Sequence, residues 1–263
     1  MKKLATTIQG LIEQVGGTWG VVLEDFESLE KWVWNGDELF YAASVIKVPV
    51  MAVVFSAVQE GWLNLGDSIV LEKEDFVDGA GVLQHLTPGT SLALRDIVML
   101  MIIQSDNTAT NMLIDLVGVE RIQQTMREAG MEKSKFHHKL MTDFSTRKGH
   151  NQVTSSDMAK LLKGISTSEQ MIEVLKKQQV RDCLPEKLPS PYADLADGEV
   201  RWELANKTGW IPGTRHDVGI FYVGQRKLIA AVLSKDVDDL LSKQVLVDIG
   251  WEIYQYLKNS NVE

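Results

Sequence analysis

Strand-like segments lie at both ends of this chain, and a long helical stretch separates them. Runs rich in β-branched and aromatic residues are typical of strands, whereas apolar residues spaced three and four apart are typical of helices. The predicted strands are residues 18–23, 31–34, 199–206, 217–223 and 228–233. The predicted helices are residues 4–15, 45–58, 95–103, 107–117, 120–129, 155–162 and 238–257. This order predicts an α/β domain, with an antiparallel sheet flanked by terminal helices, and an all-α insert.

The domain boundaries follow from the same order of elements. We expect residues 1–40 and 185–263 to form the α/β domain and residues 41–184 to form the all-α domain. Polar residues that can cap or turn the chain lie at several of the expected junctions. They include Asn35-Gly36-Asp37 after the second strand and Ser155-Ser156-Asp157 at the start of a helix. We expect an active site at the interface between the two domains.

Composition excludes several classes of protein. A formal net charge of −9 argues against a nucleic-acid partner, because phosphate binding needs a basic surface. Cys183 is the only cysteine, so no intrachain disulfide forms, and no spacing typical of metal ligands occurs. We therefore expect no metal and no cofactor. We also expect a monomer.

Nothing in the sequence is typical of a membrane span or a leader peptide. Met1-Lys2-Lys3 is followed by polar residues at helical spacing, and no run of eighteen apolar residues occurs. The expectation is a cytoplasmic protein as the sequence is written, or a secreted or periplasmic one if a leader was removed.

The first motif with chemical meaning is Ser44-Val45-Ile46-Lys47, at the start of a strongly apolar segment. On a helix, residues three apart share a face, so the lysine amine can reach the serine hydroxyl. A serine hydroxyl needs a base, and a lysine can be that base when burial lowers its pKa. The same spacing occurs at Ser28–Lys31 and Ser145–Lys148, in polar segments where a surface accident explains it. Position in an apolar segment therefore distinguishes Ser44.

Two further motifs complete a set. Ser105-Asp106-Asn107 lies between two predicted helices, and Lys207-Thr208-Gly209 ends a predicted strand. Helix capping accounts for the first taken alone, and an ordinary strand end accounts for the second. A serine hydroxyl can also relay a proton, and lysine with threonine can bind a carboxylate. The occurrence of all three motifs in this order is the signature of class A β-lactamases and penicillin-binding proteins.

The chain resembles a class A β-lactamase-type serine hydrolase over essentially its whole length, including 41–50, 105–111 and 213–217. The resemblance implies a β-lactamase/transpeptidase-like fold and an enzyme that hydrolyses a β-lactam or a related acyl substrate. It implies these roles: Ser44 as nucleophile, Lys47 as its base, Ser105 as proton relay, the backbone N–H of Trp210 in the oxyanion hole, and Asn107, Lys207, Thr208 and Arg215 as substrate ligands.

One departure from the family pattern concerns the second half of the reaction. Family β-lactamases carry a Glu-x-x-Leu-Asn loop whose glutamate activates the deacylating water, and residues 136–145 lack it. Asp143 is the carboxylate available there, as a substitute base or as a loop salt bridge. Three functions stay open: a β-lactamase, a penicillin-binding or sensor-like protein with a long-lived acyl-enzyme, and a peptidase or esterase. His216, beside the carboxylate site, either touches substrate or makes a structural hydrogen bond.

Overall fold

The computed structural model describes residues 1–141, 149–190 and 200–259. At its centre is a five-stranded antiparallel sheet in the order β2-β1-β9-β8-β7. The strands are β1 (Thr18–Asp25), β2 (Lys31–Trp34), β7 (Trp202–Ile211), β8 (Thr214–Val223) and β9 (Arg226–Lys235). Strand β1 pairs with β9 along its whole length, from Thr18 opposite Lys235 to Asp25 opposite Leu228. The first and last strands of the chain are therefore neighbours, and β7 forms one edge.

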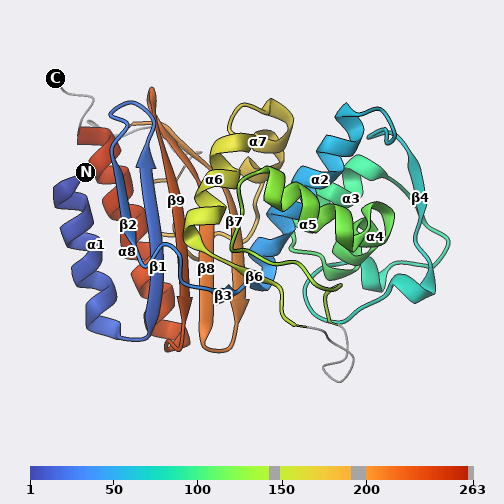
Figure 1. Cartoon of the computed structure of the whole chain (residues 1–263), viewed down its shortest axis with the longest axis horizontal. Helices are drawn as coiled ribbons and strands as arrows, with labels where there is room; N and C mark the ends of the chain where they lie inside the picture. The colour runs from blue at the N-terminus through green and yellow to red at the C-terminus, as the bar shows by residue number, and fades with distance from the viewer. Residues whose placement is uncertain (142–148, 191–199, 260–263) are drawn as a thin grey trace.

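Two terminal helices cover one face of the sheet. Helices α1 (Lys2–Val15) and α8 (Asp239–Asn259) lie side by side there, so the two ends of the described chain meet in this layer (Figure 1). Apolar residues of α1 at helical spacing, among them Leu4, Ile8 and Ile12, pack with Tyr254 and Leu257 of α8 into one buried cluster.

Helices between the strands cover the opposite face and extend away from it (Figure 1). They are α2 (Lys47–Gln59), α3 (Leu94–Ile103), α4 (Asn107–Val117), α5 (Val119–Glu128), α6 (Ser155–Ile165) and α7 (Glu169–Lys176), with a preceding 3-10 turn η1 (Ala43–Ile46). Every residue from Lys47 to Phe55 is buried, so α2 is the central helix of this region. One apolar cluster continues from α2 to Val218 and Ala231 of the sheet, so the insert shares its core with the sheet.

Short elements connect this framework. They are β3 (Phe40–Tyr41) paired with β6 (Gln152–Val153), β4 (Ser68–Val70) paired with β5 (Ser91–Ala93), and the 3-10 turns η2 (Lys73–Asp75) and η3 (Leu83–His85). No helix among the described residues is both long enough and apolar enough to cross a lipid bilayer.

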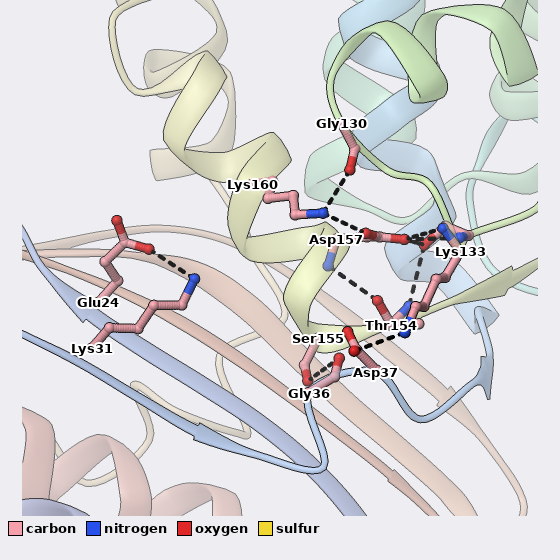
Figure 2. A network of polar contacts seen from close by, with 11 residues as sticks. Glu24, Lys31, Gly36, Asp37, Gly130, Lys133, Thr154, Ser155, Asp157 and Lys160 are labelled. Atoms are coloured by element: carbon pink, nitrogen blue, oxygen red, sulfur yellow. Dashed lines mark hydrogen bonds and ion pairs between the residues drawn. The ribbon is translucent and has the colours of Figure 1, made fainter.

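A buried carboxylate fixes the N-terminus of α6. Asp157 accepts hydrogen bonds from the backbone N–H of Lys133 (3.0 Å) and from the N–H (2.8 Å) and hydroxyl (2.9 Å) of Ser134 (Figure 2). Lys160 on the same helix bonds to Asp157 and to the carbonyl of Gly130 (2.9 Å). Because these partners satisfy the charge of Asp157, its burial is tolerated. The contacts hold α6 against the segment that runs from α5 toward β6.

The structure corrects two predictions of local structure. Thr154, not Ser155, caps α6, since its hydroxyl accepts from the N–H of Asp157 (3.1 Å). Asn35-Gly36-Asp37 follows β2 as expected, and the turn of the first hairpin spans residues 26–30, because Glu24 pairs with Lys31. The Lys207-Thr208-Gly209 motif lies inside β7, which continues to Ile211. Helix α7 and strands β3 to β6 were not predicted, because each is too short for a clear periodic pattern.

Candidate active site

The hydroxyl of Ser44 and the amine of Lys47 lie together at the junction of η1 and α2. The Nζ atom of Lys47 is 3.2 Å from the Oγ atom of Ser44. In a 3-10 turn the side chains of residues three apart eclipse one another, so the turn places the amine directly over the hydroxyl. The spacing of the first motif thus produces the predicted contact.

Lys47 is completely buried and surrounded by acceptors. Its Nζ atom bonds to the carbonyl oxygen of Ser105 (2.5 Å), the Oγ atom of Ser105 (3.0 Å) and the Oδ1 atom of Asn107 (2.8 Å). Burial lowers the pKa of Lys47 well below its usual value, and the positive charge of Lys207 lowers it further, while Asp106 opposes the shift. A neutral amine donates two hydrogens, which the carbonyl and amide oxygens can accept. Its lone pair is then available to a serine hydroxyl.

The second motif is held in place by its middle residue. Asp106 is the N-cap of α4, and its Oδ1 atom accepts from the N–H of Ala109 (2.9 Å). Its Oδ2 atom accepts from the N–H groups of Val82 (2.6 Å) and Leu83 (2.8 Å). Ser105 has a positive φ of 54°, a backbone conformation uncommon outside glycine, and its carbonyl points to Lys47. Helix capping and the site are therefore two roles of one motif.

The third motif lies on the edge strand β7. Lys207 is fully buried, and its Nζ atom donates to the carbonyl of Thr208 (2.8 Å). Burial lowers the pKa of Lys207 to about 7, partly opposed by the carboxylate of Asp217. Gly209 faces the nucleophile turn, because a Cβ atom there would lie 3.2 Å from the backbone nitrogens of Ser44 and Val45. Glycine thus permits the close approach of β7 to the turn.

Asp217 is a buried residue of this region that the sequence reasoning missed. It lies opposite Thr208 in the β7–β8 pair and is completely buried. Its carboxylate accepts from the side-chain amide of Asn206 (2.8 Å) and from the N–H of Leu184 (3.2 Å). Burial raises the pKa of Asp217 to about 6. The only sequence signal was an acidic residue at the start of the apolar run of the predicted strand 217–223.

Arg215 and Trp210 are paired across the same hairpin. The Nη1 atom of Arg215 is 3.5 Å from the carboxylate of Asp182, and its guanidinium lies over the Trp210 ring, 5.8 Å from the ring centre. The ring of Trp210 is about half exposed, and its Nε1 atom lies 3.4 Å from a carboxylate oxygen of Asp239. The role of Arg215 as a carboxylate ligand stays a prediction.

His216 makes structural hydrogen bonds. Its Nε2 atom is 2.9 Å from the carbonyl oxygen of Tyr41, and its Nδ1 atom accepts from the N–H of Ser234 (3.2 Å). These partners assign the neutral ring with the proton on Nε2. The side chain is completely buried, so of the two readings of His216 the structure supports the structural hydrogen bond.

Two asparagines hold the segment that precedes residues 142–148. The side chain of Asn111 bonds to both backbone groups of Leu140, donating to its carbonyl (3.1 Å) and accepting from its N–H (2.8 Å). The side-chain oxygen of Asn151 accepts from the N–H of His137 (2.7 Å), and its amide donates to the carbonyl of His138 (2.9 Å). Asp143, the candidate deacylation base, lies outside the described residues.

The serine beside a buried lysine, at the junction of an antiparallel sheet and a helical insert, is typical of serine hydrolases that use lysine as the base. The chain belongs to the β-lactamase enzyme family, whose family model matches residues 3–257.

Relatives of known function and structure agree with this assignment. A β-lactamase from Rhodobacter capsulatus is 26% identical over 268 residues, covering 95% of this chain and 87% of the relative. The crystal structure of a β-lactamase from Sphaerobacter thermophilus DSM 20745 is 31% identical, covers 96% of each chain and has a TM-score of 0.84. A mutant of PBP-A, solved as an acyl-enzyme complex with penicillin G, is 26% identical, covers 98% of this chain and 97% of the other, and has a TM-score of 0.81. The predicted fold and the predicted enzyme class are confirmed.

Proposed function

We propose that this enzyme hydrolyses the amide bond of a β-lactam through an acyl-enzyme formed on Ser44. The observation that carries the proposal is the contact of 3.2 Å between the hydroxyl of Ser44 and the buried amine of Lys47. Because burial lowers the pKa of Lys47 and so favours its neutral form, the amine is a better acceptor of the hydroxyl proton than an exposed lysine.

In the acylation step, the Oγ atom of Ser44 attacks the carbonyl carbon as its proton passes to Lys47. The backbone N–H groups of Ser44 and Trp210 stabilise the oxygen that becomes negative. The carbon–nitrogen bond of the ring then breaks, and the hydroxyl of Ser105 gives its proton to the leaving nitrogen. Ser105 recovers a proton from Lys47, 3.0 Å away, so the amine returns to its neutral form.

Substrate binding would use the remaining residues of the second and third motifs together with Arg215. Lys207, Thr208 and Arg215 would bind the carboxylate of the substrate, and the side chain of Asn107 would orient its amide. The penicillin G acyl-enzyme of the PBP-A mutant supports a β-lactam as the acyl donor here.

Breakdown of the acyl-enzyme distinguishes the leading function from its alternative. The residues of the Ser44 and Ser105 motifs account for acylation, while residues 136–145 lack the Glu-x-x-Leu-Asn loop. A long-lived acyl-enzyme, as in a penicillin-binding or sensor-like protein, is therefore the second candidate function. The curated β-lactamase relatives support turnover as the first.

The test is intact-mass spectrometry of the protein mixed with benzylpenicillin and followed over time. An adduct of one equivalent that forms and then clears would establish turnover. A persistent adduct would establish the alternative, and the absence of an adduct would refute both and leave a peptidase or esterase. The control is Ser44→Ala, which should remain folded and show no adduct. Light scattering of the same sample checks the expected monomer.

A further inference from the structure

The backbone in front of the nucleophile is strained. Ala43, immediately before Ser44, has a φ of 42°, in the left-handed region that residues with a side chain seldom adopt. Such a conformation costs about 1–3 kcal/mol and persists only where surrounding contacts determine it. The contacts that hold residues 39–42 therefore determine where the hydroxyl of Ser44 lies.

Those contacts come from both sides of the segment. On one side, β6 pairs with β3, and the carbonyl of Asn151 accepts from the N–H of Ala42 (2.9 Å). On the other side, the sheet supplies two side chains. Lys235 of β9 donates to the carbonyl of Leu39 (3.0 Å), and His216 of β8 meets the carbonyl of Tyr41 at 2.9 Å. The hydrogen bond of His216 is the nearer of these two to Ala43.

We propose that His216 is a positioning residue for the nucleophile, which acts by holding the carbonyl of Tyr41 so that the strained turn at Ala43 places Ser44 against Lys47. This inference rests on the proposed role of Ser44. His216 lies directly opposite Gly209 in the β7–β8 pair, and Gly209 faces the backbone nitrogen of Ser44. One cross-strand pair thus contacts the turn at Ser44 by close packing and the segment just before that turn by a hydrogen bond.

The surroundings of His216 keep its ring in a single orientation. The ring of Phe40 packs edge-on against it, with centroids 6.1 Å apart and planes at 82°. The N–H of Ser234 donates to the Nδ1 atom, so the ring proton is on Nε2 and faces the carbonyl of Tyr41. Burial lowers the pKa of His216 to about 4, so the ring stays neutral across the range in which hydrolases are assayed.

The experiment compares two amide side chains that differ in reach. The terminal amide of Gln can reach the position of Nε2 and donate to the carbonyl of Tyr41, whereas the amide of Asn ends near the position of Nδ1. His216→Asn should lower the acylation rate constant for benzylpenicillin by about 10- to 100-fold, because displacement of a reacting group by about 1 Å has that effect. His216→Gln should recover most of the rate. The dissociation constant of the initial complex should change less than twofold in both variants.

A matched control separates positioning from general stability. Trp19 is buried, and its ring N–H donates to the carbonyl of Gly16 (2.9 Å), in the cluster beneath α1 and α8. Trp19→Phe removes one buried ring donor, as His216→Asn does, and should lower the unfolding temperature without changing acylation. Equal acylation rates in the Asn and Gln variants, or an equal loss in Trp19→Phe, would overturn the proposal. If His216→Asn does not fold, His216→Phe, which keeps the ring volume but lacks the donor, replaces it.

A second readout is independent of the substrate. Hydrogen exchange at the amides of residues 42–47 should be faster in His216→Asn than in His216→Gln, and unchanged in Trp19→Phe. If benzylpenicillin forms no adduct with the wild-type protein, the proposed function is refuted, but the difference in hydrogen exchange between the two variants would still support the positioning role. If benzylpenicillin acylates the wild-type protein but hydrogen exchange is equal in His216→Asn and His216→Gln, only the positioning role is refuted.

Discussion

Removal of the Asp106 carboxylate tests how the second motif is held. Three backbone N–H groups donate to it, those of Val82, Leu83 and Ala109. Loss of a helix N-cap costs about 1 kcal/mol, and loss of a charged acceptor costs about 1.5–3 kcal/mol for each of the other two donors. Because Val82 is 43% exposed, water can reach part of this site, and we use the low end of that range, about 1.5 kcal/mol for each of the two donors. Asp106→Ala should therefore lower the free energy of unfolding by about 4 kcal/mol.

Urea unfolding measures this loss, with Thr154→Ala as the matched control. Thr154 also caps a buried helix end, but its hydroxyl accepts a single cap hydrogen bond, from Asp157, so its removal should cost about 1 kcal/mol. The two variants should have the same dependence of unfolding free energy on urea. If Asp106→Ala costs no more than Thr154→Ala, the contacts to Val82 and Leu83 contribute nothing, and the argument is wrong.

Asp106→Asn tests the charge of the same residue. The negative charge of Asp106 raises the pKa of Lys47, so its loss should lower that pKa further. Lys47 acts as a base only when it is neutral, and a lower pKa keeps it neutral to lower pH. The acid limb of the acylation rate, measured with benzylpenicillin, should therefore move to lower pH. A limb that moves upward would contradict the assignment of Lys47 as the base.

Three further predictions concern Lys207, Cys183 and Asp143. Lys207 is charged below its pKa of about 7, so its affinity for a carboxylate ligand should fall about tenfold per pH unit above that value. Titration with the ligand at several pH values measures this affinity, and an affinity that does not change with pH would exclude a charge-dependent contact. Burial raises the pKa of the Cys183 thiol, so this thiol should react with a disulfide reagent at pH 8 only after the protein unfolds. Rapid reaction of the native protein would contradict the burial of Cys183. Asp143→Asn should slow acyl-enzyme breakdown in the mass-spectrometry assay if Asp143 activates the water, and unchanged breakdown excludes that role.

Local spacing predicted much of the site. Ser44 and Lys47 are three residues apart in an apolar segment, and that spacing is enough to bring their side chains together. The convergence of Ser105, Asn107 and Lys207 on the same region followed from the resemblance, since no local rule joins residues so distant in sequence. The long strands and helices were also predicted from local sequence, because each carries its own periodic pattern of apolar residues.

Sequence reasoning did not predict the long-range partners of the residues around the site, although a structural hydrogen bond was one of the two readings of His216. The carboxylate of Asp106 bonds to Val82 and Leu83, which nothing in its own segment indicates, so only the capping role was predicted. His216 and Asp217 lie on opposite faces of β8, and their partners belong to other segments, at Tyr41 and Leu184. Such contacts depend on the completed sheet.

The pairing of β1 with β9 has a consequence for the synthesis of this protein. A ribosome releases residues 18–25 long before residues 228–235, yet each strand needs the other as its neighbour. The first hairpin must therefore remain with one edge unpaired while some two hundred residues are made, which at about 5–20 residues per second is a delay of tens of seconds at the slower rate. Contacts between residues so far apart in sequence also form slowly. We expect nascent chains of this protein to depend on chaperones that shield exposed strand edges, and the catalytic centre to be completed only after the last strand has joined the sheet.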